Sequence, residues 1–193
     1  MSVSIGDWIC TYMGLKFWPL DPRPENILIQ DIAHALSMQC RYGGHCRRFY
    51  SVAQHSVLVS NYLKEKGYVA SVQLAGLLHD AAEAYLIDMP RPIKHMPEMD
   101  DYCIFEDKIQ EVIYSKYGLP EDELSSVKEA DNAVLAVEMG YLMPAWIAQQ
   151  FYEHRGLDYS RLESSESFLT LEPSKAEDSF LDKFHDLRDQ IGG

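Results

Sequence analysis

The sequence predicts an all-α fold, and three observations indicate it. Strand signals are few, apolar residues recur at helical spacing through most of the chain, and helix start and stop signals separate these segments. At 193 residues the chain is long enough for one domain with a sizeable core. We therefore expect a single helical bundle over residues 1–193, with its core over about 25–140 and a helical extension over about 141–193.

The N-terminal segment is expected to contain loops and one helix. Pro19, Pro22 and Pro24 fall within six residues, which excludes a helix there and predicts an ordered, extended loop. Apolar positions at roughly helical spacing then predict a helix over residues 25–37. Residues 41–45 contain two glycines and predict a turn or a short, hairpin-like insertion.

Two helices with clear boundary signals follow. Ser51 and Gln54 form a capping-box pattern, which opens the first of them. The second helix is expected to begin near Ser71 and to carry the adjacent pair His79–Asp80. The proline-containing segment 89–92 is expected to end it.

The second half of the chain continues the helical pattern. Residues 98–117 fit a helix that ends at Gly118. Ser126 and Glu129 form another capping-box pattern, which opens the next helix. Residues 145–154 fit a further short helix. The last helix is amphipathic, and its apolar face carries Phe180, Leu181, Phe184 and Leu187.

Composition and charge exclude several classes of partner. The formal net charge is −13, which argues against sequence-independent binding of duplex nucleic acid. No apolar run approaches the roughly 20 residues of a membrane span, so we expect no membrane partner. The N-terminus lacks the pattern of a signal peptide, so we expect a cytoplasmic protein, in a bacterium or, if a phage encodes it, in the host.

Two small groups of basic residues stand out in this acidic chain. Arg41, Arg47 and Arg48 fall within eight residues, and Arg91 and Lys94 form a second group. Guanidinium groups bind phosphate oxygens in a bidentate way, so such groups suit a small anionic ligand. The alternative is that surface carboxylates pair with them.

The cysteines give a weaker signal. None of the four belongs to a C-x-x-C pair, and their spacing suggests no disulfide framework. The set His34, Cys40, His45 and Cys46 fits no common zinc module, because adjacent His45 and Cys46 suit a closed tetrahedral site poorly. A structural zinc site is therefore the less favoured interpretation.

The run from Leu77 to Glu83 carries the most informative residues. His79 and Asp80 are adjacent in an otherwise apolar stretch, where burying both without a partner is unfavourable. On a helix, Glu83 would share their face, four residues after His79. A divalent cation would use the imidazole and the carboxylate together, whereas the simpler alternative is that the two side chains satisfy each other.

His55 and Asp131 complete a set of candidate ligands on successive helices. Two imidazoles and two carboxylates suit a catalytic divalent transition metal with open positions, and cobalt, manganese, zinc, nickel and iron all tolerate them. Each residue alone has a simpler interpretation. His55 could be a core histidine bonded to a backbone carbonyl, and Asp131 could be a favourable charge near the start of a helix.

The order of these motifs resembles that of the HD-domain metal-dependent phosphohydrolases. Four segments are most similar to the bacterial HD-type 5′-deoxynucleotidases, within a resemblance that covers roughly residues 17–140. Phage deoxyadenylate triphosphohydrolases of the same group are also similar. The four segments are residues 51–56, 79–83, 88–94 and 128–131.

The resemblance implies roles for individual residues. Glu83 would be the acid that turnover requires, near the attacking water, and Asp88 would share proton transfer. Trp18 and Leu20 would flank the base, as the corresponding residues flank adenine in the phage enzymes. The implied metal ligands are His55, His79, Asp80 and Asp131.

The chain departs from the deoxynucleotidase pattern in two ways. Phe17 stands where those enzymes carry arginine, and a longer insertion follows Trp18. We hypothesise that this insertion, with Arg41, Arg47 and Arg48, supplies the missing phosphate contact. Lys94 of the second basic group is a further candidate for substrate binding.

The expected function is metal-dependent removal of the 5′-phosphate or triphosphate from deoxynucleotides, with dATP, dADP or dAMP as the favoured substrates. Water would attack the α-phosphorus, and a triphosphate would bring an additional magnesium ion. The alternatives are an HD-type phosphodiesterase or alarmone hydrolase, and a nucleotide-sensing module without turnover. The resemblance also suggests a homo-oligomer, since these are common in the family.

Overall fold

The all-α class is confirmed by a computed structural model, which describes residues 5–119, 124–156 and 170–192. The described part contains one small sheet, an antiparallel pair of strands β1 (Ile9–Cys10) and β2 (Lys16–Phe17). This hairpin lies in a segment for which the sequence predicted only loops. Its strands are two residues long, which is too short to produce a recognisable alternating pattern. The α-helices of the described residues are α1 (Ile29–Met38), α2 (Val52–Glu65), α3 (Ala70–Leu77), α4 (Glu83–Leu86), α5 (Arg91–Lys94), α6 (Asp100–Tyr117), α7 (Leu124–Leu142), α8 (Ala145–His154) and α9 (Pro173–Gly192).

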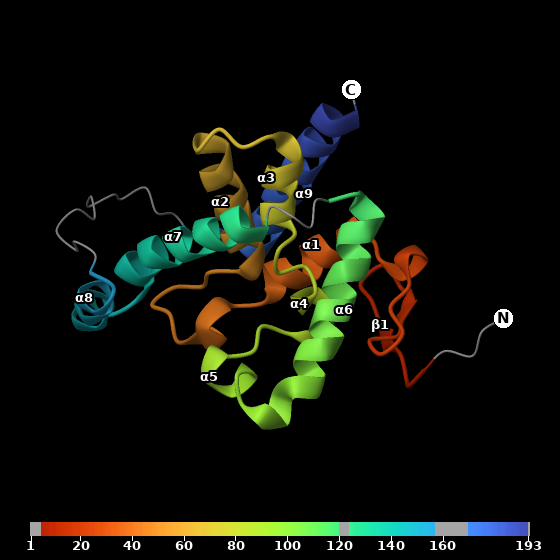
Figure 1. Cartoon of the computed structure of the whole chain (residues 1–193), viewed down its shortest axis with the longest axis horizontal. Coiled ribbons are helices and arrows are strands. Elements are labelled where there is room, and N and C mark those ends of the chain that lie inside the picture. The colour runs from red at the N-terminus through yellow and green to blue at the C-terminus, as the bar shows by residue number, and fades with distance from the viewer. Residues whose placement is uncertain (1–4, 120–123, 157–169, 193) are drawn as a thin grey trace.

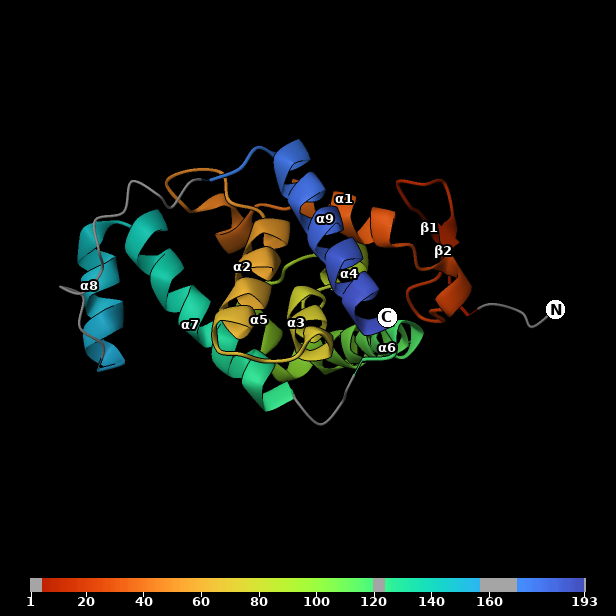
Figure 2. The same cartoon turned by 90° about the horizontal axis from the view of Figure 1, so that it is seen from above.

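The helices pack around α2 and α3, which lie side by side (Figure 1). The C-terminal helix α9 crosses over α1, α2 and α3 (Figure 2), and α7 packs against the other side of α2. The long helix α6 runs along one flank toward the N-terminal hairpin, whereas α8 lies at the opposite end (Figure 2). No helix among the described residues is long and apolar enough to cross a membrane.

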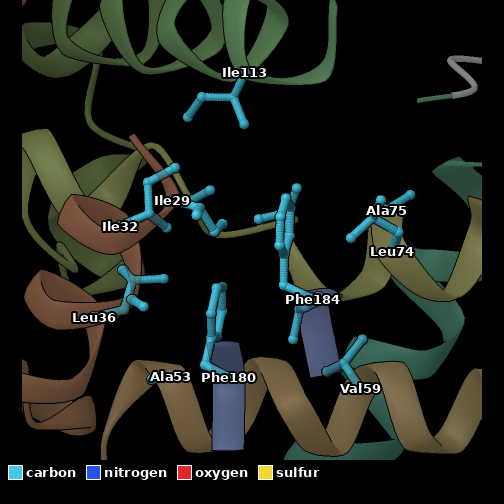
Figure 3. Close-up of a cluster of buried hydrophobic side chains, with 14 of the residues drawn as sticks. Ile29, Ile32, Leu36, Ala53, Val59, Leu74, Ala75, Ile113, Phe180 and Phe184 are labelled. Atoms are coloured by element: carbon cyan, nitrogen blue, oxygen red, sulfur yellow. The ribbon is translucent and has the colours of Figure 1, made fainter. Parts of the chain in front are cut away.

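The C-terminal helix is central to the hydrophobic core. Phe180 and Phe184 of α9 stand between Ile32 and Leu36 of α1 and Leu74 of α3 (Figure 3). All five side chains are buried. Phe180 and Phe184 therefore belong to the same core as the central helices, although they lie far beyond residue 140. Burying one phenylalanine stabilises the fold by about 1.5–3 kcal/mol.

Several predicted helix boundaries are confirmed. The Ser51 hydroxyl accepts a hydrogen bond from the Gln54 amide at 3.1 Å, as an N-cap does, and α2 begins at the next residue. Gly118 ends α6 in the left-handed region with φ 66°, which glycine adopts without a steric cost. The short helix predicted over 145–154 is α8.

Two other boundary predictions are wrong. The helix expected to carry His79 and Asp80 ends at Leu77, so this pair lies in the turn between α3 and α4. The turn is closed by the Ala81 amide, which donates to the Leu78 carbonyl at 3.1 Å. Helix α7 begins at Leu124, before the capping-box pattern that starts at Ser126. A Ser-x-x-Glu sequence is also compatible with the first turns inside a helix, so here the pattern did not mark the start of the helix.

Candidate metal centre

The four side chains that the sequence grouped as candidate ligands converge in the structure. They come from α2, from the turn after α3 and from α7. The Nε2 atom of His55 lies 3.3 Å from Nε2 of His79 and 3.3 Å from Oδ1 of Asp131. The Oδ2 atom of Asp80 lies 3.2 Å from Nε2 of His79 and 3.8 Å from Nε2 of His55. Residues up to 76 positions apart in the sequence therefore share one small volume.

The partners of the two imidazoles determine which atoms face this volume. His79 donates its Nδ1 proton to the Gly76 carbonyl at 2.8 Å. His55 donates its Nδ1 proton to the Glu138 carboxylate at 2.6 Å. In the neutral rings both Nε2 atoms then present lone pairs to each other and to two carboxylates. Acceptors this close repel one another unless positive charge lies between them, and either protons on the Nε2 atoms or a bound cation can supply that charge.

The distances and donor types fit a divalent metal. His55, His79 and Asp80 form a group that could hold a metal ion, with ligand atoms within 4.8 Å of one another. Donors bound to one transition metal at about 2.1 Å lie roughly 3.0–3.4 Å apart, close to the separations of 3.2 and 3.3 Å found here. Asp131 extends the group to two nitrogens and two oxygens. Such a mixed set is typical of a metal that keeps open positions for other ligands.

Electrostatics keep both carboxylates of the group ionised. Without a metal, burial acts to raise the pKa of Asp80, but the charge of protonated His79 and its hydrogen bond outweigh burial and hold that pKa well below its ordinary value. Burial also acts to raise the pKa of Asp131, and here the hydrogen bond with His55 and the charge of His79 again prevail. Both groups are therefore anionic acceptors at neutral pH, the state that a metal ligand requires.

Glu138 is a residue of the candidate site that the sequence analysis did not identify. Its side chain is fully buried on α7, where its two oxygens bind His55 and two tyrosines. Tyr42 donates to one oxygen at 2.6 Å and Tyr50 to the other at 2.7 Å. Burial acts to raise the pKa of Glu138, but the charges of His55 and Arg41 outweigh it, and the pKa falls to about 2. Glu138 is thus a buried carboxylate that fixes the orientation of the His55 ring.

A seven-residue offset is the sequence signal that could have identified Glu138. Glu138 follows Asp131 by seven residues, or about two helical turns, so both residues lie on the same side of α7. A glutamate on the buried face of a helix needs a partner of opposite charge or several donors. The contacts that meet this need come from residues more than 80 positions away, and helical periodicity alone does not reveal them.

The turn η2 (Arg41–Gly44) supplies the remaining contacts of Glu138. Arg41 lies 3.4 Å from Glu138 and 3.5 Å from Asp80, so its guanidinium bridges two carboxylates of the site. Tyr42 adopts the left-handed backbone region with φ 59°, which is unfavourable for a residue with a side chain. Its hydrogen bond to Glu138 opposes this cost. The turn that the sequence predicted over 41–45 therefore lies directly beside the candidate metal ligands.

Two further acids face the same region. Glu83, the first residue of α4, is buried, and its Oε2 atom has no hydrogen-bond partner among the described residues. Burial, together with the charges of Asp80 and Asp88, raises the pKa of Glu83 to about 10. Burial also raises the pKa of Asp88, and the charge of Asp80 adds to the effect. At neutral pH Glu83 is therefore a neutral acid beside ionised ones, able to hold or release a proton.

These residues open into a cavity of about 1430 Å³. One wall is formed by α6 with Gln110 and Tyr114, and another by the segment from Asp88 to His95. Val127, Leu135 and Met143 add an apolar region. The cavity is larger than a typical small-molecule pocket of roughly 300–1,000 Å³, so it has room for a nucleotide. Its basic lining residues are Arg41, Arg91, Lys94 and Lys128.

The basic residues predicted to bind phosphate divide into two sets. Arg41 and Lys94 line the cavity, and Lys94 forms an ion pair with Glu106 of α6. Arg47 and Arg48 are exposed and lie outside the described lining. Their segment is attached elsewhere, since the Arg47 amide donates to the Leu142 carbonyl at 2.9 Å.

The residues predicted to flank the base lie apart from the cavity lining. Trp18 and Leu20 follow β2, and both are half-buried. The carbonyl of Leu20 accepts a hydrogen bond from Lys108 of α6 at 3.0 Å. Phe17, which stands in place of the family's arginine, is fully buried and stacks on Tyr85 with ring centroids 3.9 Å apart. Trp18 and Leu20 are therefore not among the residues that line the cavity.

The weaker zinc candidates also separate. The Nδ1 atom of His34 lies 3.0 Å from a carboxylate oxygen of Glu177 of α9. Cys40 and Cys46 have their sulfur atoms 3.6 Å apart, and His45 is an exposed residue of the cavity rim.

The protein is therefore an all-α protein in which His55, His79 and Asp80 form a group that could hold a metal ion beside a large cavity. The chain belongs to the family of the uncharacterized protein YfdR of Escherichia coli strain K12. It is 36% identical to YfdR over 189 residues, which cover 93% of the chain and 95% of YfdR. The uncharacterized protein RCAP_rcc00048 of Rhodobacter capsulatus is 35% identical over 130 residues, or 65% of the chain and 66% of that protein. No family model matches the chain.

Proposed function

We propose that the protein is a metal-dependent phosphohydrolase that removes the 5′-phosphate or triphosphate from deoxynucleotides. The observation that carries the proposal is the group formed by His55, His79 and Asp80, whose ligand atoms lie 3.2 to 3.8 Å apart, with Asp131 3.3 Å from His55. This group lies beside a cavity whose lining includes four basic side chains. A divalent transition metal held there by His55, His79, Asp80 and Asp131 would act as a Lewis acid, activating water and polarising a phosphoryl oxygen.

The basic residues of the cavity would bind the phosphate. Arg41 is held between Asp80 and Glu138, with its side chain only 12% exposed, so little conformational freedom is lost when it meets a ligand. Lys94 is partly exposed and paired with Glu106. Charge-assisted hydrogen bonds from both would hold a phosphate close to the candidate ligands.

Glu83 would carry the proton transfer. Its raised pKa of about 10 makes it a neutral acid at pH 7, and its Oε2 atom has no partner among the described residues. A protonated acid of this kind can donate a proton to a leaving group, and after this donation its carboxylate can accept one from water. Asp88 lies on the same wall of the cavity and is the second candidate for this role.

The choice of deoxynucleotides, and of deoxyadenylates among them, rests on the resemblance to HD-type deoxynucleotidases and phage deoxyadenylate triphosphohydrolases. The length of the phosphate chain is open in this proposal, because a cavity of about 1430 Å³ has room for either a monophosphate or a triphosphate.

A product assay tests the proposal. Purified protein, loaded in turn with cobalt, manganese, zinc, nickel or iron, is incubated with deoxy- and ribonucleoside mono-, di- and triphosphates, and the products are separated by chromatography. Release of deoxynucleoside by the wild type, and none by the His79→Ala/Asp80→Ala variant, would support the proposal. Inorganic triphosphate from dATP would identify a triphosphohydrolase, and phosphate from dAMP alone a 5′-deoxynucleotidase. Binding of nucleotide without turnover, under every metal tested, would contradict hydrolysis and support a sensing role.

A further inference from the structure

Two cysteines lie on either side of the turn that supplies Arg41 and Tyr42 to the site. Cys40 directly precedes η2, and Cys46 follows it by two residues. Their Sγ atoms are 3.6 Å apart, and both residues are half-buried. The other two cysteines differ: Cys10 is exposed on the N-terminal hairpin, and the thiol of Cys103 donates to the Lys94 carbonyl at 3.5 Å.

The backbone on both sides of the turn is held in place. Cys40 forms an antiparallel bridge with Ser51, and the Arg41 amide donates to the Tyr50 carbonyl at 2.9 Å. On the other side the Arg47 amide donates to the Leu142 carbonyl at 2.9 Å. The two sulfur atoms are therefore kept close by contacts outside the turn. They need to approach by only about 1.5 Å to reach the length of a disulfide bond.

We propose that Cys40 and Cys46 form a reversible disulfide, which makes the ends of η2 a thiol–disulfide modification site at the edge of the cavity. The proposal stands on the geometry of the two sulfurs and does not depend on the proposed function. The disulfide would close a short loop around Arg41 and Tyr42. It would hold the turn in the conformation in which both residues contact Glu138.

The oxidant is a low-molecular-weight disulfide such as oxidised glutathione. The Cys40 sulfur attacks one glutathione sulfur, and the other glutathione leaves as a thiolate. Cys46 then loses its proton and attacks the Cys40 sulfur of the mixed disulfide, which releases the second glutathione. Two protein thiols lose two electrons and two protons, and one glutathione disulfide becomes two thiols.

The order of the two steps follows from the state of Cys46. Its thiol donates to the Arg48 carbonyl at 2.9 Å, and burial followed by its contact with Cys40 raises its pKa. A thiol held protonated in this way is a poor first nucleophile. We therefore assign the first attack to Cys40 and the resolving step to Cys46.

Peptide mapping tests the proposal on the intact protein. The reduced chain is incubated with oxidised glutathione, remaining thiols are blocked with iodoacetamide, and the protein is digested with trypsin. Cleavage after Arg41 and Arg47 places the two cysteines on separate peptides, 17–41 and 42–47. We expect these peptides to be linked by a disulfide that dithiothreitol removes. Glutathione adducts without the link, a link to Cys10 or Cys103 instead, or no reaction would each overturn the proposal.

Two variants and a melting curve sharpen the test. Cys46→Ser is expected to stop at a glutathione adduct on Cys40, whereas the matched control Cys10→Ser should form the link as the wild type does. Closing so short a loop is expected to raise Tm by about 5 °C in oxidised relative to reduced wild type, with no such difference in Cys46→Ser. An equal shift in both proteins would mean that oxidation elsewhere causes it.

Discussion

The candidate metal centre has two sides that differ in how the fold supports them. On the inner side, His55 is fully buried, and its ring is fixed by Glu138, which two tyrosines hold in turn. On the outer side, the cavity wall over residues 88–95 is formed by the short helix α5 and loops, and most of its residues are exposed. The candidate ligands are therefore held by the core, whereas the outer wall of the cavity consists mostly of exposed residues in short elements. Changes on the inner side should therefore affect metal binding, and changes on the outer side should affect substrate use.

The largest effect is expected from removing inner ligands. His55→Ala removes a buried imidazole and one metal ligand, so we expect loss of metal binding and a fall in kcat/KM of at least about 1,000-fold. Titration with metal by calorimetry and a nucleotide assay measure both. His185→Ala, which changes an exposed histidine of α9, is the matched control and should leave both quantities unchanged.

The next effect concerns the support of His55. Glu138→Gln keeps the shape of the side chain but removes the charge that orients the ring, so metal affinity should fall about 10- to 100-fold. Glu129→Gln, on the exposed face of the same helix, is the control. A Glu138→Gln protein that binds metal as tightly as the wild type would show that the inner side does not depend on this carboxylate.

Glu83 lies between the two sides. Its replacement by glutamine is expected to lower activity and to raise stability. Glu83→Gln is expected to lower kcat about 100- to 10,000-fold, because the side chain can no longer exchange a proton. Stability of the metal-free protein should instead rise at neutral pH, by at least about 1 kcal/mol, because the Glu83 carboxyl must take up a proton when the chain folds, whereas the amide need not. Activity assays and denaturant unfolding in the presence of a chelator measure the two effects.

The pH dependence of the unfolding free energy tests the direction of the pKa shift of Glu83. Its pKa is raised from 4.5 to about 10 in the folded chain. Its contribution to stability is therefore fully present below about pH 4.5 and is lost as the pH rises toward 10. The difference in unfolding free energy between Glu83→Gln and the wild type should grow across this window. A difference that stays constant with pH would mean that the Glu83 carboxyl ionises normally.

The smallest effect is expected on the outer side. Lys94→Gln removes a cation that lines the cavity, so KM for nucleotide should rise about 10-fold with little change in metal affinity. Arg47→Gln and Arg48→Gln change exposed cations outside the described lining, and they should leave KM within about twofold of the wild type. A larger KM effect from the two arginines than from Lys94 would favour the original sequence-based hypothesis that the insertion binds phosphate.

The sequence predicted the inner side better than the outer side. His55, His79, Asp80 and Asp131 were grouped from residue type and order alone, and the structure brings them together even though His79 and Asp80 lie in a turn rather than on a helix. Helix ends at Ser51 and Gly118 were predicted because capping is local. Glu138 was missed because its partners come from distant segments, and only the three-dimensional packing of α2 against α7 joins them.

The outer side depends on how loops fold over the core, which short-range patterns do not determine. The arginine group appeared uniform in the sequence, yet Arg41 lies within the site while Arg47 and Arg48 are exposed. The left-handed turn at Tyr42 separates them. Trp18 follows a hairpin that the sequence did not predict, so its place relative to the cavity could not be inferred from the spacing alone.

The most direct test of the central claim is the metal content of the purified protein, measured by inductively coupled plasma mass spectrometry after loading and removal of free ions. We expect one transition metal ion per chain in the wild type, a more weakly bound and partly lost ion in Glu138→Gln, and none in His79→Ala/Asp80→Ala. Absence of a stoichiometric ion in the wild type, or equal amounts in the wild type and the double variant, would contradict a metal centre formed by these residues.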